Sequence, residues 1–537
     1  MSTPSGPRGA VSASGRRWGV ASPHPDASEA AARAFASGGT AVDAALHAAT
    51  TLAVVCPHMC GVGGDLFALV RSPDGKVVAI GSAGRAPSGA DASALRAAHG
   101  TTMPEGGAGT VTVPGAVRGW QALHRLGASL PWADAFEVAI ESAGDGTHVS
   151  RDLAGALGRR ADALRSDPGF AGSPFLTGGV PTEGDLLQQA ALARTLRAIA
   201  SDGADALYEG PLAGHLAEGI RAAGVPIADA DLAAHTVDAA PPLRGRYREL
   251  EVLVSPPPSQ GFVLLEALAA LERLGADPDP VGDDVATIAA ILAAASADRD
   301  QHLADPDAMP LPVSALLDDG HIAALCDSVR AGPSAHVSPS RRGGAAGDGD
   351  TIALVAADAD GWGVSLIQSL YDSFGSGIME PSTGVILHDR GACFTLERGH
   401  PNELAAGKRP AHTLMPVAVQ QGGRLAGLAG TMGGHAQPQI DLMTLVRSFD
   451  LGMDPADAVS APRWLVGGME PVAGDAWVLC EADVPGSAKD RLAAAGFRVD
   501  PTDPNDRTLG HAMLLRIDDD AVQAASDPRS DAGALAS

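Results

Sequence analysis

The sequence predicts an α+β protein, and two observations support this prediction. Residues 22–55 alternate small apolar and polar side chains at the spacing of amphipathic helices. Residues 351–357 (TIALVAA) and 362–370 (WGVSLIQSL) are short apolar runs on either side of the turn cluster Asp358-Ala359-Asp360-Gly361. Two such runs around an Asp-Gly turn are typical of a β-hairpin.

Length and composition are those of a large globular protein. The chain has 537 residues, of which 45% are hydrophobic and 19% are charged, and this balance supports a packed core. The net charge of −26 argues against nucleic acid or an anionic membrane as the main partner, because either would favour a basic face. We see no membrane span, and no apolar segment follows the early arginines as in a signal peptide, so we expect a soluble cytoplasmic protein.

The cysteines and acidic clusters predict no metal site. Five cysteines in 537 residues are too sparse for a disulfide framework, and their number is odd. Cys56-Pro-His58-Met-Cys60 has no second Cys/His pair at zinc spacing, and the aspartates between residues 348 and 360 lack the spacing of an EF-hand. The sequence therefore predicts neither a metal nor an organic cofactor.

The first elements of the chain follow from its glycines. Residues 1–17 are predicted to be a mobile tail. Gly38-Gly39 then divides residues 22–55 into two helices, with Asp43 in the first turn of the second, where a carboxylate suits the helix dipole. A glycine-rich turn at residues 61–64 leads into a strand, and it lacks the motifs of a phosphate-binding loop. A further strand then precedes the loop that bears Arg85.

The middle of the chain is predominantly helical. Helical patterns with glycine-rich breaks cover residues 132–199, and residues 184–220 are predicted to be a pair of helices joined by a loop. A strand at residues 251–255 then runs into Pro256–Gly261 and another helix. Ser259 in that segment is not part of a GxSxG motif, so we interpret it as a cap or wall residue. Residues 331–350 are rich in Ser, Pro, Gly and charge and are predicted to be a linker.

Thr351 stands where this linker meets the first strand of the hairpin. Thr is common in strands, so its position there requires no chemistry. It also suits an N-terminal nucleophile, because cutting the Asp350–Thr351 bond would give Thr351 a free α-amine beside its hydroxyl. An α-amine has a pKa of about 8 and can act as the base for that hydroxyl. The residues at this junction leave both interpretations open.

An ordered set of motifs resembles the γ-glutamyltranspeptidase (γ-glutamyltransferase) family of N-terminal nucleophile hydrolases. The set comprises the Asp350-Thr351 junction, DADG at 358–361, Ser369, FGSG at 374–377, GVILHDRGACF at 384–394, GKRPAHTLMP at 407–416, GTMGG at 430–434 and DPR at 527–529. The resemblance implies the four-layer αββα sandwich of that class. It also implies cleavage between Asp350 and Thr351 into a large part, residues 18–350 with the processing linker 331–350 at its end, and a small part, residues 351–537. Both would form one core, because neither could bury its sheet alone.

The resemblance also assigns roles in catalysis. Thr351 would be the nucleophile, and the hydroxyl of Ser369 would hydrogen-bond to it. The backbone N–H groups of Gly433 and Gly434 would form the oxyanion hole, since glycine lets the backbone approach a reacting carbonyl closely. Arg85, just before an Ala-Pro pair, would bind the substrate carboxylate through its guanidinium fork.

Several substrate-binding positions depart from the transpeptidase pattern. Tyr371, Arg390 and Cys393 replace an Asn, a Gln and an Asp that hold the γ-glutamyl head group, and His412-Thr413 replace a Ser pair. The lost Asp would have paired with an α-ammonium, and Arg390 adds a cation. The pocket is therefore expected to prefer an acyl group with a carboxylate and no amine.

Two further points bear on the substrate. Asp372 or Asp389 could take over an ammonium group, so a γ-glutamyl substrate stays open. The pattern Arg390-Gly-Ala-x-Phe is similar to that of the divergent branch that includes cephalosporin acylase-like and oxamate amidohydrolase-like members.

The expected function is that of a self-processing N-terminal threonine amidohydrolase or acyltransferase. It would cleave a γ-glutamyl or similar carboxylate-bearing acyl amide, a small molecule, through an acyl-Thr351 intermediate. Its large and small subunits would come from one precursor, and a homodimer of these subunits is left open. A cephalosporin (glutaryl) acylase or oxamate amidohydrolase is the alternative on the same scaffold. An unprocessed, catalytically silent small-molecule-binding protein is the alternative from another class.

Overall fold

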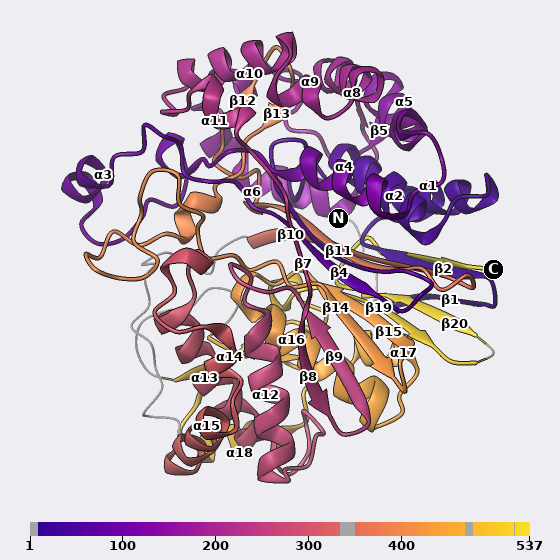
Figure 1. Cartoon of the computed structure of the whole chain (residues 1–537), viewed down its shortest axis with the longest axis vertical. Coiled ribbons are helices and arrows are strands. Elements are labelled where there is room, and N and C mark those ends of the chain that lie inside the picture. Colours follow the sequence, from indigo (N-terminus) through magenta and orange to yellow (C-terminus); the bar gives the residue numbers. More distant parts are fainter. Residues whose placement is uncertain (1–8, 333–348, 468–475, 520) are drawn as a thin grey trace.

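The computed structural model describes residues 9–332, 349–467, 476–519 and 521–537. Two seven-stranded sheets are stacked face to face between two layers of helices (Figure 1). In spatial order, the first sheet contains β21 (Gly533–Ala536), β2 (Trp18–Ser22), β10 (Gly349–Asp358), β11 (Gly363–Asp372), β3 (Asp65–Arg71), β4 (Val77–Ser82) and β7 (Asp238–Ala240). The second contains β1 (Val11–Gly15), β20 (Val522–Ser526), β19 (Ala512–Ile517), β15 (Arg424–Thr431), β14 (Val417–Gln421), β9 (Leu250–Val254) and β8 (Leu243–Tyr247).

Each helical layer covers the outer face of one sheet (Figure 1). The first sheet is covered chiefly by α1 (Pro25–Ala36), α2 (Ala41–Val55), α4 (Ala116–Gly127), α5 (Glu137–Asp145), α8 (Ala190–Asp202) and α10 (Pro211–Ala222). The second is covered by α12 (Gly261–Leu274), α13 (Val285–His302), α15 (Asp319–Ala331), α16 (Gln437–Leu445), α17 (Pro455–Ser460) and α18 (Gly486–Ala494).

Smaller elements connect and flank these layers. The helices among them are α3 (Ala92–His99), α6 (Arg151–Leu164), α7 (Pro168–Ala171), α9 (Asp205–Tyr208), α11 (Asp229–Ala233) and α14 (Val313–Leu316). The strands are β5 (Thr147–His148), β6 (Leu186–Leu187), β12 (Met379–Glu380), β13 (Val385–Ile386), β16 (Trp464–Val466), β17 (Trp477–Glu481) and β18 (Arg498–Thr502).

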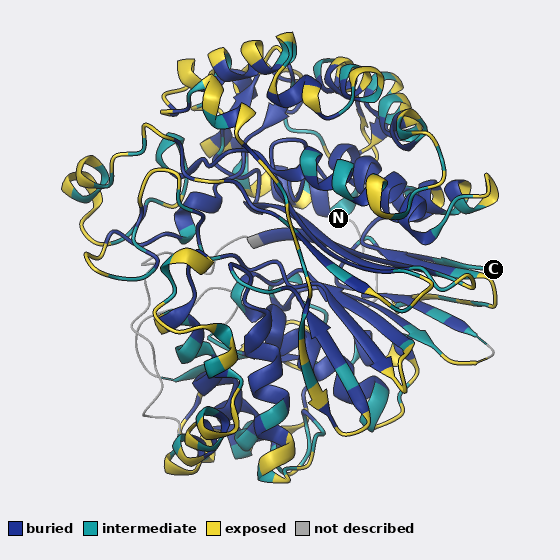
Figure 2. Ribbon diagram, viewed as in Figure 1, coloured by how far each residue is buried: buried dark blue, intermediate teal, exposed yellow. Residues whose placement is uncertain are grey.

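The strand that carries Thr351 is buried on both faces. Ile352, Leu354 and Ala356 of β10 pack beneath the first helical layer, whereas Ala353 and Val355 face the second sheet. This double burial explains why residues 351–357 form a continuous apolar run and not an alternating one. Figure 2 shows the central strands of both sheets mostly in the colour of buried residues.

The two predicted parts of the chain contribute strands to both sheets. Residues before Thr351 supply β2, β3, β4 and β7 to the first sheet and β1, β8 and β9 to the second, and residues after it supply the other strands except the first two residues of β10. The predicted four-layer sandwich is confirmed. The shared sheets also fit the expectation that neither part buries its strands alone.

Several sequence predictions are confirmed in detail. The hairpin exists as β10 and β11, which pair in antiparallel fashion. Gly38-Gly39 separates α1 from α2, and the Asp43 carboxylate caps α2 by accepting a hydrogen bond from the N–H of Thr40. Ser259 is a buried wall residue whose hydroxyl donates to the Leu414 carbonyl at 2.7 Å.

Two boundaries differ from the predictions. The mobile tail predicted for residues 1–17 is wrong at residues 11–17, because β1 (Val11–Gly15) pairs with β20, and the N–H groups of Arg16 and Arg17 donate to the Ser537 carbonyl. This edge strand is held by backbone hydrogen bonds and buries little side-chain surface, so its sequence VSASG has no apolar pattern to reveal it. The linker predicted for residues 331–350 is wrong at its ends, since α15 includes Ala331 and β10 starts at Gly349; residues 333–348 lie outside the described residues.

Candidate active site

The hairpin brings Thr351 opposite Ser369 in the middle of the first sheet. The register between β10 and β11 shifts between Asp350 and Thr351, so that Asp350 pairs with Tyr371 and Thr351 with Ser369. The regular ladder is therefore interrupted at the predicted cleavage site. Asp350, Thr351 and Ser369 are all buried.

One hydroxyl connects the predicted nucleophile with the bond it would cut. The Ser369 Oγ lies 2.8 Å from the Thr351 Oγ1, 3.0 Å from the Asp350 carbonyl oxygen and 2.7 Å from the Tyr371 N–H, which donates to it. A serine hydroxyl has one donor and two acceptor sites. These contacts are all satisfied when Ser369 donates to the Asp350 carbonyl and accepts from Thr351 and Tyr371.

The glycine-rich turn before β3 packs against this pair of strands. A Cβ at Gly64 would lie 2.5 Å from the Ser369 carbonyl oxygen, and one at Gly63 would lie 2.0 Å from the Ile386 carbonyl oxygen. Both glycines are therefore required by a close approach of backbone to backbone. The turn supports β11 and does not form a phosphate-binding loop.

Four of the predicted substrate-binding residues form one cluster. Arg390 and Cys393 lie on a short turn, η5 (Arg390–Cys393). The Arg390 Nη1 donates to the Thr413 Oγ1 at 3.0 Å and to the Cys393 Sγ at 3.4 Å. The guanidinium stacks over the ring of Tyr371, 4.0 Å from its centroid, in a cation–π contact. Tyr371, whose N–H donates to Ser369, thus connects Arg390 with the Thr351 pair.

The other terminal nitrogen of Arg390 is a candidate anion-binding group. Arg390 is 1% exposed, and its Nη2 is buried without a hydrogen-bond partner among the described residues. A buried donor that lacks a partner costs free energy, and charged donors cost the most. A substrate carboxylate would satisfy this nitrogen.

The cluster is bordered by a buried carboxylate. The Asp389 Oδ1 accepts the Asp372 N–H at 3.1 Å, and Asp389 has no exposed surface. The possibility that one of them takes an ammonium group stays a prediction.

His412 lies beside this cluster, but both of its ring nitrogens form hydrogen bonds within the protein. Its Nε2–H donates to the Asp65 Oδ2 at 3.1 Å, and its Nδ1 accepts the Leu414 N–H at 3.3 Å. Burial, with a smaller contribution from Arg390, lowers the pKa of His412 to about 3 against the opposing effect of Asp65. His412 is therefore neutral and has no ring nitrogen left for a substrate.

Asp65 is a buried anion that the sequence analysis did not select. Burial alone would raise its pKa, but contacts with His388 and His412 outweigh burial and hold the pKa well below its usual range. Asp65 also accepts the Gly84 N–H at 3.1 Å. It follows the Gly63-Gly64 pair directly, and this position gave no signal of its contact with His412, which is 347 residues away.

Arg85 does not join the cluster. Its side chain is 47% exposed, and it donates to the Gly407 carbonyl at 2.9 Å and lies 3.6 Å from Asp305. These contacts attach two loops to each other. The structure therefore does not support the predicted role of Arg85 as the carboxylate ligand, and Arg390 with Thr413 is the better candidate.

Gly433 and Gly434 form the tight turn after β15. Their φ angles are +153° and +52°, conformations that favour glycine. The Gly434 carbonyl accepts from the Gln260 Nε2 at 2.9 Å, which fixes the peptide orientation. The turn leads into η6 (Gly434–Ala436), which packs against β10. The geometry is compatible with the predicted oxyanion hole.

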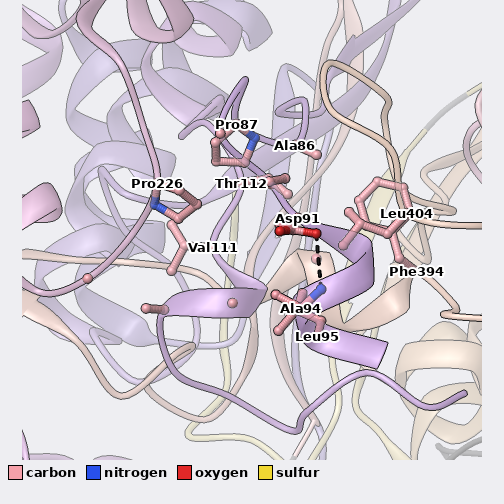
Figure 3. Close-up of a pocket in the computed structure, with 16 residues that line it drawn as sticks. Ala86, Pro87, Asp91, Ala94, Leu95, Val111, Thr112, Pro226, Phe394 and Leu404 are labelled. Atoms are coloured by element: carbon pink, nitrogen blue, oxygen red, sulfur yellow. Dashed lines mark hydrogen bonds between the residues drawn. The ribbon is translucent and has the colours of Figure 1, made fainter. Parts of the chain in front are cut away.

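A cavity of about 320 Å³ lies beside η5 (Figure 3). Gly391 of η5 and Phe394 directly after it line the cavity, together with Ala86, Leu95, Val111 and Pro226. The lining is mostly apolar. The one charged lining residue, Asp91, caps α3 through the N–H groups of Ser93 and Ala94.

One group of side chains among the described residues could hold a metal ion. Donor atoms of Glu266, Asp298 and His321 lie within 4.8 Å of one another between α12, α13 and α15. Within the part of the chain that the structure describes, no hydrogen bond or ion pair joins these three residues to Thr351, Ser369 or Arg390. The absence of a metal in catalysis remains a prediction. None of the described helices combines the length and the apolar character needed to cross a membrane.

Comparison with known proteins identifies the family. The family model described as Gamma-glutamyltranspeptidase matches residues 27–537. The chain is 37% identical over 522 residues to the oxamate amidohydrolase proenzyme of Klebsiella pneumoniae, covering 95% of this chain and 97% of that protein. It is 34% identical to the glutathione hydrolase-like YwrD proenzyme of Bacillus subtilis, covering 97% and 98% of the two chains.

A solved structure agrees with these relatives. The cephalosporin acylase from Bacillus halodurans superposes with a TM-score of 0.89 at 28% identity, covering all of this chain and 98% of that one. The match extends over both sheets and both helical layers. The chain belongs to the gamma-glutamyltranspeptidase family and is an N-terminal nucleophile amidohydrolase of that family.

Proposed function

We propose that the chain cuts its own Asp350–Thr351 bond and then uses Thr351 to hydrolyse amides whose acyl group carries a carboxylate and no ammonium. The observation that carries the substrate class is the buried Arg390 guanidinium. It is fixed by Thr413 and Tyr371, and its Nη2 is without a hydrogen-bond partner among the described residues. An α-ammonium placed there would be repelled by this cation.

Self-cleavage would begin with attack of the Thr351 hydroxyl on the Asp350 carbonyl carbon. An ester would form at the Thr351 Oγ1 as the peptide C–N bond breaks, and the nitrogen would become the α-amine. Water would then hydrolyse the ester and leave Asp350 as a new C-terminus. The contacts of the Ser369 hydroxyl with the Thr351 Oγ1 and the Asp350 carbonyl oxygen support this step.

Turnover would repeat this chemistry on a substrate. The α-amine would take the proton of the Thr351 hydroxyl while the Oγ1 attacks the amide carbon, and the proton would pass to the leaving amine. Backbone N–H groups at Gly433 and Gly434 would stabilise the oxyanion, an effect worth roughly 3 kcal/mol for one donor. Water would release the acyl group from the Oγ1 and regenerate Thr351.

Intact mass spectrometry of the purified protein beside a Thr351→Ala variant tests the nucleophile. We expect two chains from the wild type, the smaller beginning with Thr351, and one uncut chain from the variant. A single uncut chain in both would overturn the proposal and favour the catalytically silent binding protein.

Hydrolysis assays then test the acyl group. Oxamate is the amide named for one relative, and it carries a carboxylate without an amine. We expect kcat/KM for oxamate or a glutaryl amide to exceed that for the matched γ-glutamyl amide. A clear preference for the γ-glutamyl amide would overturn the proposed substrate class and point to Asp372 or Asp389 as an ammonium ligand.

The cavity beside η5 favours a second candidate, an acylase that acts on larger amides. The cavity is large and apolar enough to receive a hydrophobic group of the substrate. Glutaramate and glutaryl anilide share one acyl group and differ in the leaving amine. A much lower KM for the anilide would support the acylase, whereas equal KM values would favour small primary amides.

A further inference from the structure

An ion pair with a buried carboxylate connects the residue before the cleavage site with a distant loop. The Arg507 Nη2 donates to the Asp350 Oδ1 at 2.7 Å, and the Asp350 side chain is 2% exposed. Arg507 belongs to the segment of residues 506–511, here named the 506–511 loop, which contains η8 (Arg507–Leu509) and precedes β19. The proposed chemistry of Thr351 does not account for this contact.

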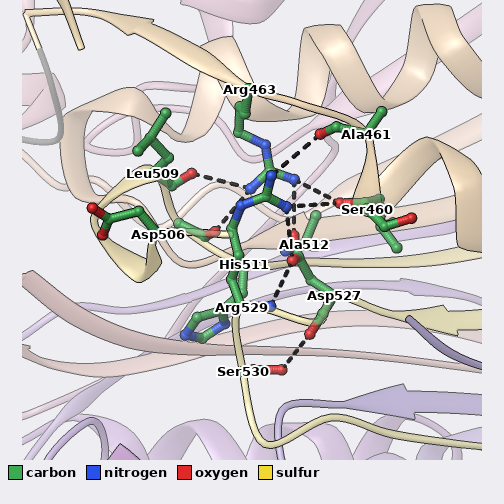
Figure 4. Close-up of polar contacts among 12 residues, drawn as sticks. Ser460, Ala461, Arg463, Asp506, Leu509, His511, Ala512, Asp527, Arg529 and Ser530 are labelled. Carbon is green, nitrogen blue, oxygen red and sulfur yellow. Dashed lines mark hydrogen bonds and ion pairs between the residues drawn. The ribbon is translucent and has the colours of Figure 1, made fainter. Parts of the chain in front are cut away.

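A network of buried charges holds the 506–511 loop in place (Figure 4). The Arg463 Nη1 donates to the carbonyls of Leu509 at 3.0 Å and Gly510 at 2.8 Å, and its Nη2 pairs with Asp527 at 2.8 Å. Asp527 also pairs with Arg529 at 3.0 Å. Because these charges are almost fully buried and paired, loss of one partner would be costly, so the loop has a fixed position.

The start of the loop is attached to the same network. Glu481 binds Arg529 at 2.6 Å through its Oε2, and its Oε1 accepts the Asp506 N–H at 3.1 Å. Asp506 in turn accepts the Thr508 N–H at 2.9 Å. Arg507 is therefore held on both sides by residues that have fixed partners.

The same loop packs against the candidate oxyanion turn. The Met432 N–H donates to the His511 carbonyl at 3.0 Å, and a Cβ at Gly510 would lie 2.3 Å from the Met432 carbonyl oxygen. Met432 directly precedes Gly433. The loop therefore connects the turn of the oxyanion hole with the side chain of Asp350.

We propose that Arg507 is a positioning residue for self-cleavage, which holds the Asp350 carboxylate so that the Asp350 carbonyl stays against Ser369 and Thr351. The inference rests on the proposed role of Thr351. Asp350 pairs with Tyr371, and the strand register shifts between Asp350 and Thr351, so the ladder is irregular at the scissile bond. The ion pair of the Asp350 side chain with Arg507 therefore helps to hold the scissile carbonyl in place.

Arg507 is expected to act in self-cleavage and not in turnover. After cleavage, Asp350 is a C-terminus that is no longer bonded to Thr351. The ion pair of Arg507 with Asp350 then no longer influences the position of Thr351 through the peptide bond. Loss of Arg507 should slow self-cleavage and leave the turnover of fully matured protein as it is in the wild type. A purely structural role would instead affect both.

The test is a time course of self-cleavage by intact mass, with variants Arg507→Gln, Arg507→Lys and Asp350→Asn. We expect Arg507→Gln and Asp350→Asn to slow cleavage by roughly tenfold to a hundredfold, the effect of losing one charge-assisted hydrogen bond. Arg507→Lys should recover part of the rate. The double variant should be no slower than either single one, because both remove the same contact.

Arg424→Gln is the matched control, because it removes an ion pair with Asp519 in which both side chains are more than two-thirds exposed. It should cleave like the wild type. An unchanged cleavage rate in Arg507→Gln, or additive losses in the double variant, would overturn the inference. An equal loss of kcat/KM in matured Arg507→Gln protein would also overturn it and show that Arg507 has a general structural role. A wild-type chain that stays uncut would overturn the proposed function itself.

Discussion

At the scale of single residues, the site depends on hydrogen bonds made by one hydroxyl and one guanidinium. Ser369 contacts both the Thr351 hydroxyl and the Asp350 carbonyl, and Arg390 presents one buried nitrogen without a partner among the described residues. The first arrangement suits bond cleavage and the second suits recognition of an anion. They can be tested separately.

Ser369→Ala should slow both self-cleavage and turnover, and Ser369→Thr should retain most of both. Alanine removes the hydroxyl from three contacts, whereas threonine keeps a donor and acceptor at the same position. Loss of such a bond corresponds to roughly tenfold to a hundredfold in rate. Time courses of cleavage and kcat of matured protein measure the effect, and wild-type rates in Ser369→Ala would contradict it.

Arg390→Gln should raise KM for carboxylate-bearing amides by more than tenfold, with a smaller change in kcat, because a charged hydrogen bond to the substrate is worth about 1.5–3 kcal/mol. Arg85→Gln is the control, since its guanidinium lies outside the cluster. Its KM should stay close to that of the wild type. A raised KM in Arg85→Gln with an unchanged KM in Arg390→Gln would instead identify Arg85 as the ligand of the substrate carboxylate.

At the scale of elements, the glycine-rich turn before β3 sets the position of β11. Gly64 meets the Ser369 carbonyl so closely that no side chain fits between them. β11 thus brings Ser369 opposite Thr351, and the glycine-rich turn packs against the Ser369 carbonyl. A change in the turn should be transmitted to the hydroxyl contacts of Ser369.

Gly64→Ala should slow self-cleavage and destabilise the fold by about 1–3 kcal/mol, the usual cost of overpacking in a tight core. Gly61→Ala is the matched control in the same turn, because a Cβ there would meet no atom within 4 Å. Denaturant unfolding and the cleavage time course measure the two effects. Equal behaviour of both variants would contradict the role given to the turn.

At the scale of the whole molecule, many histidines are buried in neutral form. Burial lowers the pKa of His412 to about 3 and the pKa values of His235 and His511 to about 4. The unfolded chain binds protons on these rings below about pH 6.5, and the folded chain does not. Acid therefore favours the unfolded state between that pH and the folded pKa values.

The free energy of unfolding should fall between pH 7.5 and pH 5 by about 2 kcal/mol for each of these three histidines. The uncut Thr351→Ala variant is suited to this measurement, because it keeps a single chain throughout unfolding. Denaturant titrations at both pH values give the difference. A His412→Gln variant, which keeps a donor for Asp65, should lose part of the pH dependence, and stability that is independent of pH would contradict the prediction.

The sequence by itself determined the local elements. The apolar runs around Asp358–Gly361 specify a hairpin because strand propensity and turn chemistry agree there, and Gly38-Gly39 separates two helices because glycine ends helices. The ordered motifs also indicated the family and the candidate nucleophile Thr351. These signals lie within short segments, so they are visible without the fold.

Only the tertiary structure decided which distant residues meet. β1 forms because its backbone finds β20, and its side chains give no sign of this. Arg507 reaches Asp350 across 157 residues, and Arg390, not Arg85, joins Tyr371 and Thr413. His412 is hydrogen-bonded to Asp65. These contacts depend on loop positions fixed by buried charges and close backbone packing, which act between segments and leave no periodic pattern in the chain.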